Sequence, residues 1–445
     1  MSNNNFFMSD ADKAKLAAAK EWFKNAGYGM MIHWGLYCLP AGEWKGRRME
    51  DIGEWAQQYF RIPNAEYHQL AKCFNPILFN AEEWVKTAKD AGMQYMVFTS
   101  KHHEGFAMFH SKVSKFNVVD ATPFGRDVVA ELAEACYKHN LKFGLYYSQD
   151  LDWAHPDGGG YLTGKTWCGD KAWWVNNWDY PDTEKKDYTR CFEEKIKPQV
   201  KEILTNYGDL CLIWFDTPQT ISAEQTDELY RMVKTYQPAC LVNSRIGNGY
   251  GDYTSAGDNE MPEDGQTDLL FETPATLNDT WGYKAFDTNW KSPEEVVRLR
   301  RLCRDRGANY LLNVGPTGEG EIPLMQEALL RGIGGWIEAT GGVIYEAKPC
   351  DILGDGKNFA LRAGNKLYFF IHNLSIVGNS DVTFGECTEG LRTFRGVANK
   401  IKRVCWLDNG KEIGFKQTDD ECLLDCNGYP YGTDLVVRIA EAELE

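Results

Sequence analysis

The sequence lacks any apolar run close to the roughly 20 residues that a membrane-spanning helix needs. Its 13 cysteines include no C-x-x-C pair, and an odd number of scattered thiols fits reduced cysteines better than disulfides or a zinc site. Basic charge is also scarce. With 48 Lys and Arg against 64 Asp and Glu, the formal net charge is −16, which repels nucleic acid and anionic membranes. We therefore expect no nucleic-acid partner, no membrane partner and no metal.

The first residues, MSNNNFFMSDADKAK, lack the basic segment and following apolar segment of a secretory signal peptide. We expect a cytoplasmic protein, or an exported one if a signal peptide has been removed from its beginning. A glycine-rich fingerprint is also missing after the first apolar run, where the sequence reads HWGLYCLPAGEW. Because no loop is built to cradle a nucleotide phosphate, we expect no cofactor. The sequence leaves the oligomeric state open.

Aromatic residues, in contrast, are abundant. The 445 residues include 15 Trp, 22 Tyr and 22 Phe, so 13% of the chain is aromatic, more than a hydrophobic core needs. Carbohydrate-active proteins use such rings as flat platforms for the faces of sugars. The hydrophobic fraction of 43% and the charged fraction of 25% exclude a disordered, collagen-like or coiled-coil chain.

Short apolar runs alternate with amphipathic segments over residues 1–347. The expected strands are Tyr28–His33, Gln94–Thr99, Lys142–Tyr147, Leu210–Phe215, Ala239–Asn243, Asp268–Phe271 and Asn309–Val314. The expected helices are Ala11–Asn25, Ala81–Ala91, Arg126–His139, Thr183–Asn206, Ala223–Tyr236, Pro293–Arg306 and Pro323–Ala339. Strands that are apolar on both faces and alternate with helices indicate a covered parallel sheet. Seven of them favour an α/β fold, an irregular (β/α)8 TIM-like barrel, over an open doubly wound sheet.

The pattern changes near residue 348, where short segments of alternating polarity replace the helical periodicity. Asn409-Gly410 lies between two of these segments and is a strong signal for a tight β-hairpin. We therefore predict a C-terminal antiparallel β-sandwich over residues 348–445. We expect it to support the barrel rather than to bind sugar.

Polar and aromatic residues follow the predicted barrel strands directly, which is where α/β barrels place their chemistry. Asp216 comes straight after the run LCLIWF, so it either caps the next helix or faces the mouth of the barrel. A carboxylate that is flanked by aromatic residues suits a glycosidase nucleophile. From the residues alone, both interpretations stay open.

His102 and His103 are adjacent on a predicted strand end, so their side chains point to opposite sides and chelate a metal poorly. The metal-binding spacings H-x-H and H-E-x-x-H are both absent. We expect neutral imidazoles that hydrogen-bond sugar hydroxyls, with a buried structural histidine as the alternative for the ring that faces away.

Seven blocks of the sequence resemble the retaining α-L-fucosidases of glycoside hydrolase family 29, in the order found in that family. They are GMMIHWG with AGEW (Gly29–Trp44), FTSKHHEGFAMFHS (Phe98–Ser111), GLYYSQDLDW (Gly144–Trp153), LIWFD (Leu212–Asp216), NSR (Asn243–Arg245), TLNDTWGY (Thr276–Tyr283) and NYLLNVGPTGEG (Asn309–Gly320). The resemblance covers about residues 15 to 345. It implies hydrolysis of terminal α-L-fucose from a fucosylated glycan, with a β-sandwich after the barrel.

The resemblance also implies roles for individual residues. Asp216 corresponds to the catalytic nucleophile, and Glu263 in GDNEMPED is the first choice for the acid/base, although Met261 stands where the family usually has Thr. Glu272, preceded by Phe271 where Trp is usual, and Glu260 are the other choices. The residues implied to bind the sugar are His33, Glu43, Trp44, His102, His103, one of Tyr146 and Tyr147, Trp214, Arg245 and Glu272.

The linkage is a further expectation. Trp-Phe-Asp-Thr-Pro at residues 214–218 looks like the branch of the family that prefers α-1,3 and α-1,4 fucose beside a branching galactose. The tryptophan-rich insertion at residues 157–179 would supply the second subsite, or would simply pack on the barrel. Two rival functions stay open: a barrel glycosidase for another sugar, and a catalytically silent carbohydrate-binding protein.

Overall fold

The computed structural model describes residues 7–161, 174–255, 257–263, 270–377, 389–430, 433 and 435–445. The chain forms two compact units. The first consists of Met1–Lys89, Met93–Lys291 and Arg306–Glu327, and the second of Asp90–Gly92, Ser292–Asp305 and Ala328–Glu445. The predicted division at residue 347 follows instead the change from helices to strands along the sequence.

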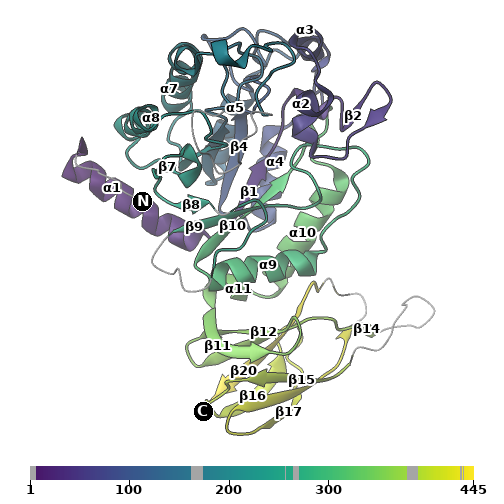
Figure 1. Ribbon diagram of the computed structural model, residues 1–445. Helices are drawn as coiled ribbons and strands as arrows, with labels where there is room; N and C mark the ends of the chain where they lie inside the picture. Colours follow the sequence, from purple (N-terminus) through teal and green to yellow (C-terminus); the bar gives the residue numbers. More distant parts are fainter. Residues whose placement is uncertain are drawn as a thin grey trace. The chain divides into compact units, whose positions relative to one another are not determined.

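The first unit is built on an eight-stranded parallel sheet that curls on itself (Figure 1). In sheet order its strands are β7 (Leu241–Val242), β6 (Leu212–Phe215), β5 (Lys142–Tyr147), β4 (Tyr95–Lys101), β1 (Tyr28–Ile32), β10 (Ala308–Val314), β9 (Phe271–Thr276) and β8 (Thr254–Ser255). The two edge strands meet through a parallel bridge between Asn243 and Tyr253. Strand therefore follows strand in chain order around a barrel, and all carboxyl ends open on one face.

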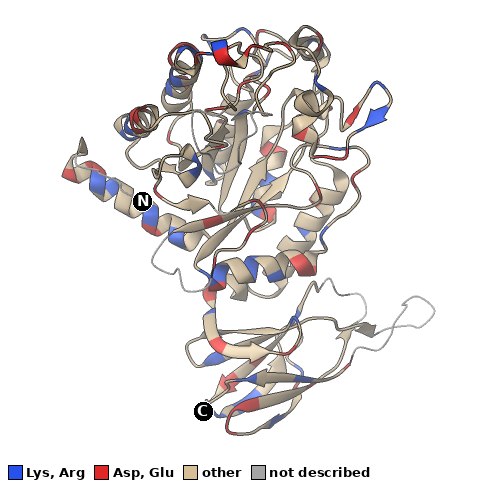
Figure 2. Cartoon of the chain, in the orientation of Figure 1, with Lys and Arg blue, Asp and Glu red and all other residues tan. Residues whose placement is uncertain are grey.

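Helices connect the strands of the first unit. They are α1 (Asp10–Ala26) before β1, α4 (Ala81–Asp90), α5 (Val128–Lys138), α7 (Lys197–Asn206) and α8 (Ala223–Tyr236). Their starts are set by side-chain caps: Ser9 accepts from the backbone N–H of Asp12, and Ser222 forms a reciprocal capping box with Gln225. Acidic and basic residues are interspersed along α1, as on a solvated helix face (Figure 2).

The segment predicted as one helix from Thr183 to Asn206 is broken into pieces. A short turn η5 (Thr183–Lys185) precedes α6 (Tyr188–Cys191), and a π-helical turn η6 (Phe192–Ile196) joins α6 to α7. Pro198, in the first turn of α7, has no backbone N–H to donate, which favours a new helix start over an uninterrupted ladder.

Between β1 and α4 the chain makes a long excursion over the mouth of the barrel. It contains η2 (Leu36–Cys38), the hairpin β2 (Glu43–Trp44) and β3 (Arg47–Arg48), η3 (Gly53–Trp55), α2 (Ala56–Phe60), α3 (Asn64–Tyr67) and η4 (His68–Cys73). This excursion brings η3 to the carboxyl ends of the barrel strands.

The second unit contains α9 (Pro293–Asp305), most of α10 (Leu324–Ala339), α11 (Val343–Glu346) and an antiparallel sheet. In sheet order the strands are β16 (Ile401–Trp406), β20 (Arg438–Leu444), β13 (Lys366–Ile371), β12 (Phe359–Ala363), β11 (Lys348–Gly354), β15 (Gly390–Arg395), β18 (Glu421–Cys426) and β17 (Gly414–Gln417). A two-stranded piece pairs β14 (Ile376–Val377) with β19 (Tyr429–Pro430). The sheet encloses one apolar core that includes Phe369, Phe394 and Trp406.

The predicted fold class, a parallel α/β barrel followed by an antiparallel β domain, is confirmed. A hairpin turn forms at Asn409-Gly410, with Gly410 at φ 70°, in the left-handed region that glycine tolerates. It is not the tight two-residue turn that this dipeptide predicted, because Trp406 pairs with Lys411 across a four-residue loop and Asn409 is not left-handed. The sequence pattern missed β8, because two residues give no apolar run. In the strand predicted at Asp268–Phe271, the first two residues lie outside the described chain, and β9 begins at Phe271. Among the described residues, no helix is both long and apolar enough to span a bilayer.

Candidate active site

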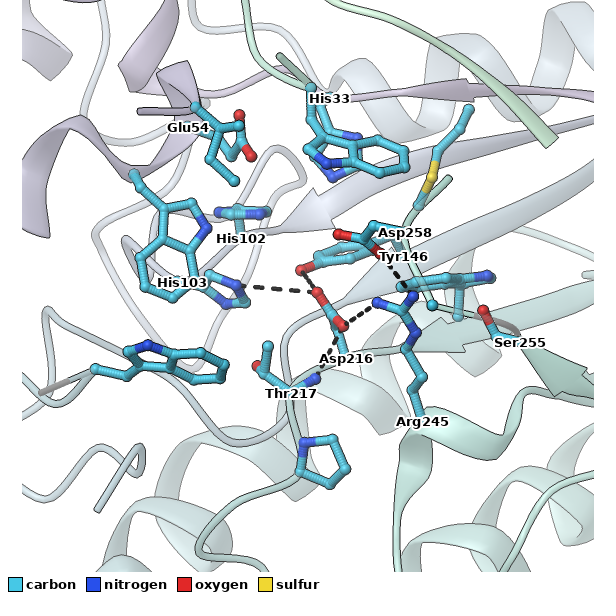
Figure 3. A pocket seen from close by; sticks show the side chains of 18 of the residues that line it. His33, Glu54, His102, His103, Tyr146, Asp216, Thr217, Arg245, Ser255 and Asp258 are labelled. Carbon is cyan, nitrogen blue, oxygen red and sulfur yellow. Dashed lines mark hydrogen bonds and ion pairs between the residues drawn. The ribbon is translucent and has the colours of Figure 1, made fainter. Parts of the chain in front are cut away.

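The carboxyl-terminal ends of the barrel strands surround a cavity of about 650 Å³ (Figure 3). Its wall comes from the ends of β1, β4, β5, β6, β7, β8 and β9 and the segments that follow them, with η3 from the excursion after β1. The lining residues are Met31, His33, Ile52, Glu54, Trp55, His102, His103, Tyr146, Trp174, Trp214, Asp216, Thr217, Pro218, Ser244, Arg245, Ser255, Gly257, Asp258, Glu260 and Trp281.

Asp216 follows β6 and is held at the centre of this cavity from several directions. Tyr146 donates its hydroxyl to Oδ2 over 2.9 Å, and Arg245 Nη1 donates to Oδ1 over 3.1 Å. The backbone N–H of Asp216 is itself bonded to Oε1 of Gln149 at 2.8 Å. Thr217, which donates its N–H to Oδ1, has φ 48°, a strained conformation for a β-branched residue. The carboxylate is thus oriented in advance, and it is not used as a helix cap.

Arg245 joins two carboxylates in the cavity. Its second terminal nitrogen, Nη2, lies 2.6 Å from Oδ1 of Asp258, while Nη1 contacts Asp216. The guanidinium lies over the ring of Trp214, 4.7 Å from the centroid. Burial lowers the pKa of Arg245, but the charges of Asp258 and Asp216 outweigh burial and raise it above its ordinary value. The arginine therefore stays cationic at every working pH.

Three buried histidines line the opposite wall. Burial lowers the pKa of His33 to about 4, and it lowers the pKa values of His102 and His103 well below the ordinary value. All three rings are therefore neutral near pH 7. Nε2 of His103 lies 3.9 Å from Oδ2 of Asp216, too far for a direct hydrogen bond. The contacts of these rings with sugar hydroxyls stay a prediction.

The choice between the two adjacent tyrosines of β5 follows from the alternation of side chains along a strand. Tyr146 points into the cavity, where it bonds Asp216 and stacks on Trp214 with ring centroids 5.6 Å apart. Tyr147 points away and donates to Oε1 of Gln199 over 2.9 Å. The cavity residue is therefore Tyr146.

The structure does not bring Glu43 and Trp44 to the cavity. They form the outer hairpin strand β2, where Glu43 is exposed. Glu54 and Trp55 of η3 line the cavity instead, and Trp55 lies edge-on to His103 at 5.2 Å. Burial raises the pKa of Glu54 to about 8, so its carboxyl is largely protonated at neutral pH. Gly-Glu-Trp occurs twice, at residues 42–44 and 53–55, and that repeat was the sequence signal for the missed pair.

Glu272 is fully buried beneath the cavity rather than on its wall. It accepts hydrogen bonds from Tyr95 over 2.7 Å and from Nε1 of Trp214 over 2.8 Å. The Tyr95 ring that makes this bond packs directly against Gly29. A side chain at Gly29 would collide with the ring, since an added Cβ would lie 2.5 Å from Cζ. Burial raises the pKa of Glu272 to about 7. Glu272 bonds the indole of Trp214, and Tyr146 and Arg245 both pack on that ring. The structure therefore places Glu272 where it supports the cavity wall from beneath.

Two acidic residues that follow β8 reach the cavity. Asp258 pairs with Arg245, and Glu260 contributes to the wall. Glu263, the first choice from the sequence for the acid/base, is described and exposed but does not line the cavity. The acid/base candidates from the sequence were all glutamates, so Asp258 was not among them.

The insertion at residues 157–179 is described only in part. Residues 162–173, which include Trp167 and Trp173, lie outside the described chain. Trp174 lines the cavity and meets Trp55 edge-on at 5.4 Å, whereas Trp178 donates to the carbonyl of Ile62 and packs on the barrel. One tryptophan of this insertion thus faces the cavity and one is structural.

The part of the chain that the structure describes contains no cluster of three or more His, Cys, Asp or Glu side chains that could hold a metal ion. The predicted absence of a metal stays a prediction, which chelation tests below.

A parallel barrel whose mouth holds oriented carboxylates, neutral imidazoles and aromatic walls has the parts that a glycoside hydrolase needs. The family model for α-L-fucosidases matches residues 1–342. The chain therefore belongs to the α-L-fucosidase family, glycoside hydrolase family 29, as the sequence blocks implied, and its enzymatic class is α-L-fucosidase.

Individual relatives agree with this assignment. The α-L-fucosidase AlfC from Lactobacillus casei, solved in complex with α-L-fucose, is 51% identical and covers 73% of this chain and 99% of its own, with a TM-score of 0.69. A variant of AlfC is solved in complex with Fuc(α1,6)GlcNAc. The α-L-fucosidase isoenzyme 1 of Paenibacillus thiaminolyticus is 32% identical and covers 97% of this chain and all of its own, with a TM-score of 0.79. The tissue α-L-fucosidase of Homo sapiens is 32% identical over 352 residues, 74% of this chain and 69% of that protein.

Proposed function

We propose that the protein is an exo-acting retaining glycosidase that removes terminal α-L-fucose from oligosaccharides or glycoconjugates by double displacement. The observation that carries the mechanism is the placement of Asp216, whose two oxygens are held by Tyr146 and Arg245 at the centre of the cavity. A carboxylate fixed in this way can attack the anomeric carbon and form a covalent glycosyl-enzyme. Water then releases fucose with its original anomeric configuration.

The second carboxyl group is proposed to be Asp258. Asp258 and Asp216 bind the two terminal nitrogens of one guanidinium, which is compatible with the separation of roughly 5–5.5 Å in retaining enzymes. In the structure the carboxylate of Asp258 is paired with Arg245. The proposal requires the bound sugar to replace that ion pair. Glu260 is the second candidate because it lines the same wall, and Glu263 stays a prediction from the sequence.

The acid/base is tested with alanine variants of the three residues Asp258, Glu260 and Glu263. Loss of the acid slows substrates with poor leaving groups far more than activated aryl fucosides, whose leaving groups need little protonation. We expect that split for Asp258→Ala, with external azide restoring activity on the aryl fucoside. A split found only in Glu260→Ala or Glu263→Ala would transfer the role to that residue.

The reaction type is tested with 4-nitrophenyl α-L-fucoside beside aryl α- and β-galactosides. Hydrolysis of the fucoside but of neither galactoside supports the proposal. Retention is tested separately, by following the anomeric proton by NMR during the reaction to see whether α-L-fucose appears first. Efficient cleavage of a galactoside would favour the rival of a glycosidase for another sugar. Binding without turnover of any of them would favour the silent carbohydrate-binding protein.

For the linkage, two proposals compete. The sequence motif at residues 214–218 supports a preference for α-1,3 and α-1,4 fucose, with a second subsite for the branching galactose. The relative AlfC, with half of its residues identical, supports cleavage of α1,6-linked fucose on N-acetylglucosamine. We favour the α1,6 linkage, because the described part of the insertion contributes only Trp174 to the cavity.

The linkage test compares kcat/KM on Fuc(α1,6)GlcNAc, Lewis-type trisaccharides, 2′-fucosyllactose and the aryl fucoside. Under the α1,6 proposal the disaccharide is the best of the three natural glycans. A larger kcat/KM on the Lewis-type trisaccharides would restore the α-1,3/1,4 preference. Equal values on all three would describe an enzyme that ignores the linkage.

A further inference from the structure

Two of the three cavity histidines have a single protein partner on the ring nitrogen Nδ1. Nδ1 of His103 lies 2.7 Å from the hydroxyl oxygen of Ser148, and Nδ1 of His33 lies 2.7 Å from Oδ1 of Asn313. Both partners are buried, with Ser148 completely inaccessible and Asn313 1% exposed. Neither Ser148 nor Asn313 lines the cavity. Their effect on a substrate must therefore pass through the histidines.

The proton between His103 and Ser148 can be assigned from the second bond of the serine. The Ser148 hydroxyl lies 2.8 Å from the backbone carbonyl oxygen of Leu151. A carbonyl oxygen only accepts, so the single hydroxyl proton of Ser148 is used in that bond. The serine oxygen must then accept from His103, whose Nδ1 carries the ring proton.

The same argument assigns His33. Nδ2 of Asn313 lies 2.7 Å from the backbone carbonyl of Trp281, which again only accepts. This contact fixes the amide orientation, because the NH₂ group must face Trp281. The amide oxygen therefore faces His33 and accepts the proton from its Nδ1. Since the low pKa values keep both rings neutral, each ring has one proton and it resides on Nδ1.

We propose that Ser148 and Asn313 are positioning residues that fix His103 and His33 as Nδ1–H tautomers, so that both rings offer an unprotonated Nε2 to donating hydroxyls of the sugar. This inference rests on the proposed function, since it assigns a hydrogen-bond direction to contacts with bound fucose. In this arrangement the two rings act as acceptors. A sugar position that cannot donate a proton is then rejected at these contacts.

The tautomer of His103 also affects the nucleophile. Its Nε2 faces Oδ2 of Asp216 at 3.9 Å (Figure 3). This separation is too long for a direct hydrogen bond, so the ring acts on the carboxylate through its dipole. With the proton held on Nδ1 by Ser148, the lone pair of Nε2 faces this oxygen, and the Tyr146 hydroxyl is its hydrogen-bond donor. His102 differs, because its buried Nδ1 has no hydrogen-bond partner among the described residues.

The first experiment measures the tautomers in the free enzyme and needs neither substrate nor activity. Histidine labelled with ¹⁵N is incorporated, and the ring nitrogen shifts and two-bond couplings are recorded near pH 7. His33 and His103 are assigned by their replacement with Gln, and both are expected to show the Nδ1–H pattern. An Nε2–H pattern at both residues in the wild type would overturn the proposal, whatever the enzyme hydrolyses.

The variants for this experiment are Ser148→Ala and the control Ser100→Ala. Ser100 is an equally buried serine whose hydroxyl donates to the backbone carbonyl of Tyr146 and not to a histidine. We expect the signal of His103 in Ser148→Ala to shift toward Nε2–H or to become a mixture, while that of His33 stays unchanged. In Ser100→Ala both histidines should keep the wild-type pattern. An unchanged His103 tautomer in folded Ser148→Ala would contradict the role of the serine.

The second experiment measures binding of L-fucose and of its 2-, 3- and 4-deoxyfluoro analogues by competition. Fluorine can accept weakly but cannot donate, so each analogue removes one donated hydrogen bond. In the wild type, the position that donates to His103 should lose about tenfold or more in affinity. Ser148→Ala should lose this discrimination at that one position, and Asn313→Ala at a different one.

A purely structural role predicts another result. Both variants would then weaken all four sugars by the same factor, and the discrimination among positions would persist. That outcome, with correct folding, would overturn the positioning role. If none of the four sugars binds the wild type, the proposed function fails instead, and the NMR result on the free enzyme still decides the tautomers. Ser148→Thr, which retains the hydroxyl, should restore the wild-type discrimination.

Discussion

The hydroxyl of Tyr146 donates to Oδ2 of Asp216 over 2.9 Å, and this bond joins the ends of the neighbouring strands β5 and β6. Arg245 engages the other carboxylate oxygen from beyond β7. Both oxygens of the proposed nucleophile are therefore oriented before a sugar enters. Such preorganisation avoids a cost of reorientation during the reaction.

Asp216→Ala should lose nearly all kcat toward aryl fucosides, because it removes the group that forms the covalent intermediate. Azide should rescue part of the activity by entering the vacated space. Circular dichroism and thermal melting serve as controls for folding. If the variant keeps more than about a tenth of wild-type kcat, a barrier change below roughly 1.4 kcal/mol, Asp216 is not the nucleophile.

The two tyrosines of β5 form a matched pair of variants. Tyr146→Phe removes the hydrogen bond to Asp216 and should lower kcat/KM by about tenfold or more, since a charged group loses a donor. Tyr147→Phe removes the bond to Gln199 outside the cavity and should leave kcat/KM unchanged within about twofold, while lowering stability by about 1 kcal/mol. Equal losses of kcat/KM in the two variants would refute the conclusion that Tyr146 faces the cavity and Tyr147 faces away from it.

The two Gly-Glu-Trp sequences provide a second matched pair. Trp55→Ala removes a ring that lines the cavity beside His103 and should raise KM for aryl fucosides several-fold. Trp44→Ala changes the outer hairpin and should leave KM within about twofold of the wild type. Initial-rate kinetics on both variants show whether Trp55 or Trp44 contributes to substrate binding. A larger effect at Trp44 would support the original choice from the sequence.

Glu272 should make stability depend on pH. Its pKa of about 7 in the folded protein lies above the ordinary value of 4.5, so the folded state binds the proton more tightly than the unfolded state does. Its contribution is fully present below pH 4.5 and is lost as pH rises through about 7. The magnitude is at most on the order of 3 kcal/mol.

The measurement compares urea unfolding of the wild type and of Glu272→Gln at pH 5 and pH 8. The glutamine has the shape of the carboxyl but does not titrate. We expect the stability advantage of the wild type to shrink from pH 5 to pH 8. A difference that is the same at both pH values would show that Glu272 does not titrate in this range.

Chelation should have no effect on this protein. No metal-binding spacing occurs in the sequence, and the described residues contain no ligand cluster. Dialysis against EDTA should leave kcat/KM and the melting temperature unchanged. Stoichiometric zinc in elemental analysis, lost together with activity, would contradict this.

Several features followed from the sequence by itself. Apolar runs that alternate with amphipathic segments predicted the parallel barrel. A strand of such a sheet is covered on both faces, so its residues are apolar throughout and not only at every second position. In such a barrel the residue after each strand lies at the mouth, so Asp216, His33 and Arg245 could be located from their position along the chain. The order of residues along the chain is enough to place these side chains at the ends of the strands.

The tertiary structure decided what depends on residues far apart in sequence. Alternation placed Tyr146 and Tyr147 on opposite sides, but only the packed barrel showed which side faces the cavity. Glu54 reaches the site through a long excursion, and Glu272 is buried under it, because the return path of a chain is set by packing and not by local pattern.

The proton positions also belong to the tertiary structure. The tautomers of His33 and His103 depend on carbonyl groups that accept from Asn313 and Ser148, and the carbonyl bonded to Asn313 lies 32 residues away in sequence. A sequence shows that a histidine is present. Which ring nitrogen carries the proton is decided by the fixed donors and acceptors that folding places around it.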